Sequence, residues 1–185
     1  MQSTDIDLRH NFGVSLYERN DPRAIDVFEK VLEMDSTNID VINWIGVIHG
    51  DNGEIDKEIE TYEKGIALEK TNPESAAYCY NNRALIYKEQ GKTDEALSDY
   101  TKAVDLDPDN PDRYNARAFL YEELGEVNKA LNDYSKAIDL DDENPVNWTS
   151  RADFHYNAGH YQDAIQDYYK VLEFDSTDVD AINSI

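Results

Sequence analysis

The sequence predicts an all-α fold made of tandem helix pairs, and three observations support this prediction. A segment of 34 residues recurs along the chain of 185 residues. Within each copy, apolar and small residues follow the i, i+4, i+7 spacing of one helix face. Glycine, asparagine and proline stand between these stretches, where helices stop and start.

The repeat is clearest where two copies align without a gap, at residues 91–107 and 125–141. An aromatic residue marks five copies at spacings of 34, 38, 34 and 34 residues: Phe28, Tyr62, Tyr100, Tyr134 and Tyr168. The longer interval predicts a loop with four additional residues, which fit at 69–76. The five copies are expected at 6–38, 39–72, 77–110, 111–144 and 145–178, and 179–185 would begin an incomplete sixth.

Each copy is predicted to form two helices. The first helix of a copy begins after an Asn-Pro pair, as at Asn110 and Asn144, because asparagine caps a helix and proline is tolerated at the first helical position. A glycine such as Gly125 then marks the stop. In the second helix of the fourth copy, one face carries small and large residues: Ala130, Leu131, Tyr134, Ala137 and Ile138.

This pattern resembles the tetratricopeptide repeat (TPR) family. The third copy matches every position of the family motif: Tyr80, Ala84, Tyr87, Ala96, Tyr100, Ala103 and Pro108. The second copy departs from it with Glu58 at a small position, and the fifth has His155 at an aromatic one. The resemblance implies a right-handed α-solenoid of antiparallel helix pairs, a TPR superhelix, formed as a single array over residues 1–185.

The resemblance also implies a protein-protein interaction scaffold that binds an extended peptide or a partner protein in a concave groove, without catalysis. The expected groove residues are Asn43, Trp44, Tyr78, Asn81, Asn82, Asn115, Phe119, Thr149 and Asp153. An asparagine amide has both a donor and an acceptor, so a row of them can pair with a peptide backbone. Alternatively, these are polar residues on an exposed face without a role.

One specialised subclass of the family, the carboxylate clamp that grips chaperone tails, is not expected here. Asn82 fits its middle element. However, Asn43 and Val47 before it, and Asp112 and Ala116 after it, do not supply the cations that would neutralise a terminal carboxylate.

Charge limits the possible partners. The chain has 40 acidic and 17 basic residues and a formal net charge of −23. Nucleic acids and anionic membrane surfaces require a basic patch, so neither is expected as a partner. A basic or neutral peptide is expected, with association that weakens as salt rises. The alternative is that most of this charge is solvated surface.

Other functional classes lack their sequence signals. No apolar run reaches the length of a membrane span, and the N-terminus does not resemble a signal peptide, so a soluble, cytoplasmic protein is expected by default. Cys79 is the single cysteine. The four histidines are scattered and the Asp105 segment lacks the glycine of a calcium loop, so no catalytic residue, metal or cofactor is expected.

The last residues suggest two alternative functions. The sequence stops a few residues into a sixth repeat, where Ile182 and Ile185 would lack a second helix to pack on. The chain is therefore also consistent with a structural module that self-associates through open repeat ends. A regulatory segment of a larger protein is a weaker alternative, and a natural C-terminus with a frayed tail is another.

Overall fold

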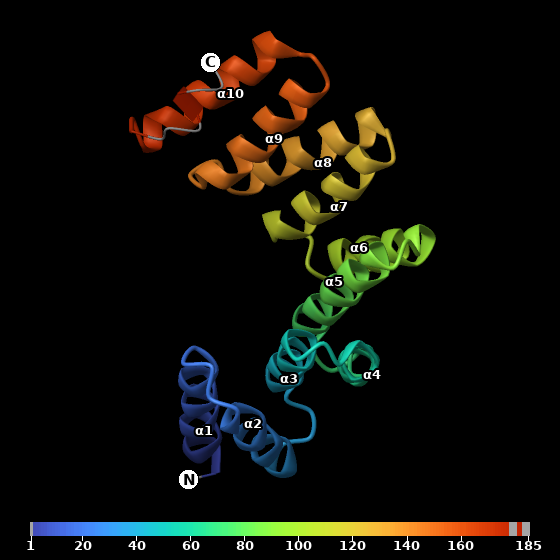
Figure 1. The fold of residues 1–185 in the computed structure, drawn as a ribbon, viewed down its shortest axis with the longest axis vertical. Helices are drawn as coiled ribbons and strands as arrows, with labels where there is room; N and C mark the ends of the chain where they lie inside the picture. Colours follow the sequence, from blue (N-terminus) through green and yellow to red (C-terminus); the bar gives the residue numbers. More distant parts are fainter. Residues whose placement is uncertain (1, 178–180, 183–185) are drawn as a thin grey trace. The chain divides into compact units, whose positions relative to one another are not determined.

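The computed structural model describes residues 2–177 and 181–182, and in these residues it contains ten α-helices and no strand (Figure 1). The helices are α1 (Gln2–Tyr17), α2 (Arg23–Met34), α3 (Ile39–Asp51), α4 (Ile55–Ile66), α5 (Pro73–Glu89), α6 (Thr93–Leu106), α7 (Pro111–Glu123), α8 (Val127–Leu140), α9 (Pro145–Asn157) and α10 (Tyr161–Phe174). The predicted all-α fold of helix pairs is confirmed.

The helices form two compact units, residues 1–106 with α1–α6 and residues 107–185 with α7–α10. In each unit the main contacts join consecutive helices into pairs, such as α3 with α4 and α9 with α10. Neighbouring pairs in the same unit also touch through their first helices, α3 with α5 and α7 with α9. These contacts place α3 beside α5 and α7 beside α9.

The expected helix starts are present. Asn110 and Asn144 cap α7 and α9, and their side-chain oxygens accept hydrogen bonds from the backbone N–H groups of Asp112 and Val146. Proline occupies the first turn of both helices, where its missing N–H leaves no intrahelical bond unmade. The Asn-Pro pairs therefore act as helix start signals.

The turn within a pair depends on a left-handed residue. Gly91, Gly125 and Gly159 have φ between 71° and 78°, a conformation that costs glycine little. The first pair has no glycine at this turn, and Asn20 takes the conformation instead, with φ 55°. Asparagine is among the few other residues that adopt it readily.

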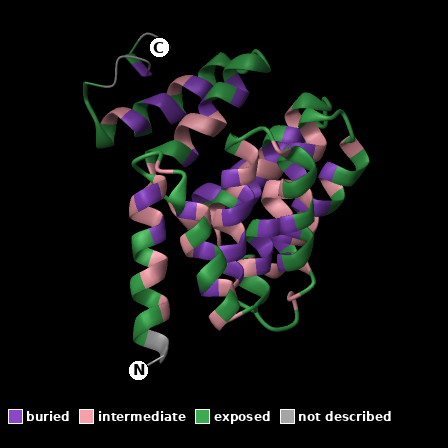
Figure 2. Ribbon diagram, turned by 60° about the horizontal axis from the view of Figure 1, so that its bottom comes forward, coloured by how far each residue is buried: buried purple, intermediate pink, exposed green. Residues whose placement is uncertain are grey.

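Small residues and aromatic rings pack against each other inside each pair. A Cβ atom on Gly13 would lie 2.6 Å from the ring of Phe28, so only glycine fits there. In later pairs Ala118 and Ala152 are fully buried at the corresponding positions. Buried residues follow one side of most helices, whereas in the described part of α1 only Gly13 and Leu16 are buried (Figure 2).

The prediction of a loop lengthened by four residues is wrong. The connection from α4 to α5 has six residues where the others between pairs have four, and α5 itself has 17 residues against 13 in α3, α7 and α9. Asn72 caps α5 and Pro73 opens it, so residues 73–76 add one turn to this helix.

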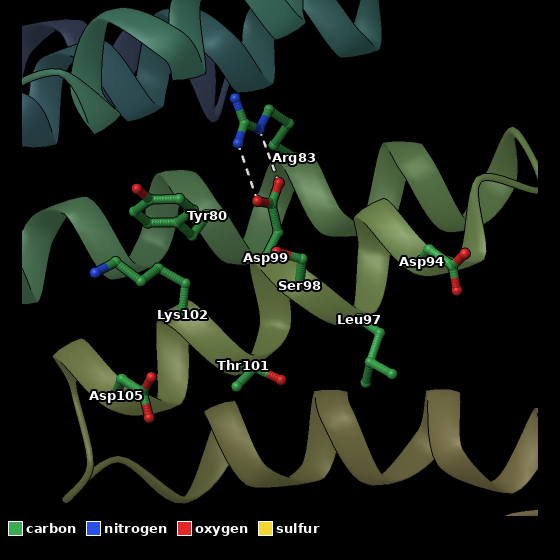
Figure 3. A pocket seen from close by; sticks show the side chains of 9 residues that line it. All are labelled: Tyr80, Arg83, Asp94, Leu97, Ser98, Asp99, Thr101, Lys102 and Asp105. Atoms are coloured by element: carbon green, nitrogen blue, oxygen red, sulfur yellow. Dashed lines mark hydrogen bonds and ion pairs between the residues drawn. The ribbon is translucent and has the colours of Figure 1, made fainter.

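In each of the last three helix pairs, an ion pair between an arginine and an aspartate joins the first helix to the second. The sequence pattern did not predict these ion pairs. Arg83 binds Asp99 through two hydrogen bonds of 2.8 and 2.9 Å, drawn as dashed lines in Figure 3. The same bidentate pairing, also over 16 residues, joins Arg117 to Asp133 and Arg151 to Asp167. The aspartates are buried, so these charges require each other.

Candidate functional site

The first helices of the first unit form the wall of a cavity of about 390 Å³, named here the Trp44 cavity. Its lining comes from α1, α3 and α5: His10, Asp40, Asn43, Trp44, Val47, Tyr78 and Asn82. The α3 residues share one face because they are spaced by three or four positions. Four residues expected in a groove, Asn43, Trp44, Tyr78 and Asn82, are thus brought together.

Aromatic packing fixes one wall of the Trp44 cavity. The Trp44 ring is parallel to the ring of Phe28, with centroids 6.1 Å apart, and is tilted against Tyr17 at 5.1 Å. Phe28 is fully buried, so it holds the indole in place. Tyr78 on α5 is 45% exposed. The cavity therefore combines a fixed aromatic wall with an accessible aromatic ring.

Asn43 is used within the protein. Its side-chain oxygen accepts a hydrogen bond from Sγ of Cys79 at 3.1 Å, and its amide donates to the carbonyl of Ser75 at 3.4 Å. Both partners are on α5, so Asn43 joins α3 to α5. Burial raises the pKa of Cys79 to about 12, which keeps this thiol protonated and able to donate.

A second cavity, of about 270 Å³, adjoins the first and is named here the Glu58 cavity. It is lined by residues of α3, α4 and α5: Val47, Gly50, Asp51, Ile55, Glu58, Tyr62, Asn82, Leu85, Ile86 and Glu89. Val47 and Asn82 line both cavities. The two hollows therefore form one continuous surface, aromatic at one end and acidic at the other.

Three carboxylates line the Glu58 cavity. Burial raises the pKa of Glu58 above its ordinary value, and the nearby charges of Glu89 and Asp51 raise it further; a hydrogen bond with Tyr62 and the charge of His49 oppose this shift. Among the described residues, no lysine or arginine lies within ion-pair distance of these three carboxylates. The cavity thus presents negative charge that the described cations leave unpaired.

Two other expected groove asparagines are partly turned inward. The side-chain oxygens of Asn81 and Asn115 are buried and have no hydrogen-bond partner among the described residues. The Asn115 amide donates to Asn147 at 2.7 Å, and Asn147 in turn donates to the carbonyl of Asp141. Asn115 therefore connects α7 to α9 in the second unit, just as Asn43 connects α3 to α5 in the first.

The remaining expected residues lie in the second unit. Phe119 on α7 is 47% exposed. Thr149 on α9 donates to the carbonyl of Pro145 at 3.0 Å, and Asp153 accepts from the hydroxyl of Tyr168. Phe119 is therefore an exposed apolar residue, whereas Thr149 and Asp153 already hold hydrogen bonds within the unit.

A third hollow, of about 720 Å³, runs along α6 beside α5 (Figure 3). Four of its polar side chains are engaged with each other or with Glu69: Arg83 binds Asp99, and Tyr80 and Lys102 both bind Glu69. Because these charged and hydroxyl groups are already paired, this hollow is a weaker candidate than the Trp44 and Glu58 cavities.

Comparison with protein families agrees with this architecture. Models described as tetratricopeptide repeat match residues 39–72 and 111–144, and a model described as TPR repeat matches residues 84–125. The chain belongs to the tetratricopeptide repeat family. Tetratricopeptide repeats are generally non-catalytic modules of protein interaction. No curated protein sequence matches the chain.

Solved structures show the same fold. A thermophilic TPR protein of Thermus thermophilus, TTC0263, superposes with a TM-score of 0.69 at 21% identity, covering 97% of this chain and 96% of that one. PilF of Pseudomonas aeruginosa gives a TM-score of 0.79 at 20% identity, covering 99% and 82%. The first TPR of Spaghetti (RPAP3), bound to the HSP90 peptide SRMEEVD, gives 0.54 at 30% identity, covering 60% and 87%.

The longest helix among the described residues of this TPR chain is α5, with 17 residues. Within the part of the chain that the structure describes, no helix combines the length and apolarity required to cross a membrane.

Proposed function

We propose that this TPR chain is an interaction scaffold and that it binds an extended basic peptide along the Trp44 and Glu58 cavities. The observation that carries the proposal is their continuity through Val47 and Asn82. A peptide lying across both would meet an aromatic anchor site and then an acidic site, two features typical of peptide recognition.

The Trp44 and Glu58 cavities are suited to different side chains of the peptide. An apolar peptide residue would bury its surface against Trp44 and the exposed ring of Tyr78. A lysine or arginine would place its charge among Asp51, Glu58 and Glu89, with its methylene stem along apolar wall residues. Asp51 and Glu58 accept hydrogen bonds only from the neutral hydroxyls of Tyr17 and Tyr62, so their charges supply the complementarity for this second residue.

Asn82 lies between the two ends and is suited to the peptide backbone. Its side chain also hydrogen-bonds the hydroxyl of Tyr62, but with two N–H donors and an acceptor the amide can still pair with a peptide group whatever the side chain. Asn43 is a weaker candidate for such contact because it already bonds Cys79 and Ser75. In the second unit, Asn115 is a weaker candidate for the same reason, since it bonds Asn147, and Phe119 is the favoured contact residue there.

The expected partner differs from that of the peptide-bound relative. The peptide SRMEEVD in that structure carries two glutamates, one aspartate and a single arginine. The acidic lining of the Glu58 cavity would repel such a sequence. We therefore infer a partner segment that is net positive.

Selection from a random peptide library tests this function. We expect the full chain to enrich peptides with a bulky apolar residue close to lysine or arginine. Binding of a selected peptide, followed by fluorescence anisotropy, should weaken at least about tenfold between about 50 and 500 mM salt. Enrichment of acidic peptides, or an affinity independent of salt, would contradict the proposal.

Matched variants locate the peptide. We expect Tyr78→Ala and Glu58→Ala each to weaken binding by about tenfold or more, since each removes one end of the surface. Glu29→Ala changes the net charge by the same amount as Glu58→Ala at an exposed position of α2, and it should leave the affinity nearly unchanged. Equal losses in Glu58→Ala and Glu29→Ala would show that only the overall charge matters.

Self-association is a second proposal, supported by apolar side chains at the end of the described chain. Tyr169 and Phe174 on α10 and Ile182 beyond it are 55%, 47% and 50% exposed. Ile185, which the sequence pattern grouped with Ile182, lies outside the described residues. Light scattering at rising concentration tests this proposal: a chain that stays monomeric would overturn it, and Ile182→Lys should abolish any dimer.

A further inference from the structure

A cluster of metal-ligating side chains lies where α9 passes into α10. His155 is near the end of α9, His160 caps α10 and Asp163 is in its first turn. One ligand atom from each of the three residues lies within 4.8 Å of the others. The histidine spacing alone did not suggest a third ligand, because Asp163 is brought close only by the turn.

The backbone of the turn fixes this arrangement. The His160 N–H donates to the carbonyl of His155 at 2.8 Å, and the Asp163 N–H donates to the carbonyl of His160 at 3.1 Å. Gly159, with φ 78°, allows the chain to reverse between the two histidines. The three residues are therefore held together by the helix pair itself.

His155 carries an unused donor or acceptor atom. The residue is only 7% exposed, and its Nδ1 is buried with no hydrogen-bond partner among the described residues. Its ring lies 5.8 Å from the ring of His160. A buried polar atom without a partner is rare in folded proteins and indicates an interaction still to be made.

The equivalent corners of two earlier helix pairs each contain a cation. In α5 and α7, tyrosines occupy the position of His155, and a lysine amino group lies over each ring: Lys92 at 5.4 Å from Tyr87 and Lys129 at 5.3 Å from Tyr121. At the α9–α10 corner, histidine replaces the tyrosine, and the positions of Lys92 and Lys129 are occupied by His160 and Asp163. The α9–α10 corner therefore has potential metal ligands at positions where the α5–α6 and α7–α8 corners have a lysine and a tyrosine ring.

We propose that His155, His160 and Asp163 bind a divalent transition metal ion such as Zn²⁺. Two imidazole nitrogens and one carboxylate oxygen are a ligand set that zinc accepts, with a fourth position for water. Imidazole ligands disfavour Ca²⁺ and Mg²⁺, which prefer oxygen. The site lies in the second unit and shares no residue with the peptide-binding surface.

Only small side-chain movements are needed to bind the ion. Zinc–ligand bonds of about 2.0–2.2 Å place tetrahedral ligand atoms about 3.4 Å apart, so separations of up to 4.8 Å must shorten by up to about 1.4 Å. His160 and Asp163 are exposed and can rotate toward the buried ring of His155. The bound ion would then link the end of α9 to the start of α10 and stabilise this pair.

Zinc titration of the full chain, freed of metal, tests the proposal. We expect one high-affinity Zn²⁺ site by calorimetry, visible absorption of a tetrahedral complex with Co²⁺, and a melting temperature raised by about 5 °C at a hundredfold excess over the dissociation constant. The histidine ring signals of His155 and His160 should shift in NMR spectra, whereas those of His10 and His49 should not.

Variants decide whether the ion sits at this corner. His155→Tyr restores the residue found at the two equivalent corners, and His160→Gln changes an exposed side chain, so both are expected to fold and to lose the Co²⁺ spectrum. His49→Gln, a histidine paired with Glu54, should retain it. Absence of zinc binding, or binding that His160→Gln leaves unchanged, would overturn the proposal, even if His155→Tyr failed to fold.

Discussion

A Cβ atom on Gly50 would lie 2.7 Å from Oε1 of Glu58, so the side chain missing at one position leaves room for the carboxylate at the other. Four other second helices carry alanine where Glu58 stands: Ala24, Ala96, Ala130 and Ala164. Those alanines are buried. The second helix pair thus has an acidic group at a packing position, and a glycine on the facing helix accommodates it.

The first prediction is that Gly50 and Glu58 are energetically coupled. In a Glu58→Ala background, Gly50→Ala should stabilise the protein by about 0.5–1 kcal/mol, because alanine favours the helix over glycine. In the native background this gain should be lost, since the new methyl group displaces the carboxylate. Urea denaturation of the four proteins measures the coupling. Additive effects within about 0.3 kcal/mol would contradict it.

The second prediction concerns the pH dependence of stability. Burial and nearby carboxylates raise the pKa of Glu58 in the folded state. The stability contributed by this group is therefore present below the unfolded-state pKa and lost as pH rises through the folded-state pKa. Consequently, Glu58→Gln should become more stable relative to the native chain as pH increases from about 3 to 7.

Glu69 provides a control with the opposite sign. Hydrogen bonds from Lys102 and Tyr80 lower the pKa of Glu69, so its contribution is present above the unfolded-state pKa and lost as pH falls. Relative to the native chain, Glu69→Gln should therefore lose stability with increasing pH. Denaturation midpoints across this pH range measure both differences, and parallel profiles for the two variants would refute the assignment.

The third prediction concerns close packing between α4 and α5. A Cβ atom on Gly65 would overlap Sγ of the fully buried Cys79. Overpacking of this kind should destabilise Gly65→Ala by about 1–3 kcal/mol in urea denaturation. Cys79→Ala removes the sulfur and should relieve most of that cost in the double variant. Equal effects of Gly65→Ala in both backgrounds would show that the sulfur is not the cause.

The fourth prediction concerns the arginine–aspartate pairs. Asp133→Ala should destabilise the chain by about 3 kcal/mol, because it leaves the mostly buried guanidinium of Arg117 without its partner. Replacing both residues, as Arg117→Met with Asp133→Leu, should restore stability to within about 1 kcal/mol of the native chain. Glu173→Gln, which breaks the exposed pair with Lys170, should change it by less than about 0.5 kcal/mol.

The helix pairs could be predicted because each position of the repeat has one local role. Asn110 and Asn144 cap helices and Gly125 permits a turn, and none of these effects depends on distant residues. The four-residue insertion could not be placed in the same way. Asn72 and Pro73 form a start signal like the others, but whether the added residues join α5 or the loop depends on packing against α4.

The candidate site could be predicted only in part. Trp44, Tyr78 and Asn82 lie on the faces expected from helical spacing and line one cavity. Spacing does not reveal that Asn43 and Asn115 bond residues 32 to 36 positions away, on the next first helix. The role of Glu58 was equally hidden, because the glycine that accommodates it lies on another helix.

The 16-residue separation of the arginine–aspartate pairs also has a consequence for folding. Arg83, Arg117 and Arg151 each find their aspartate within the same helix pair, so each pair can close over a short loop without waiting for its neighbours. The corresponding residues of the first two pairs are Phe12 with Val27 and Ile45 with Thr61, which form no ion pair. We therefore expect folding to begin in the hairpins that carry the arginines, with residues 2–66 ordering later upon α5 and α6 of the same unit.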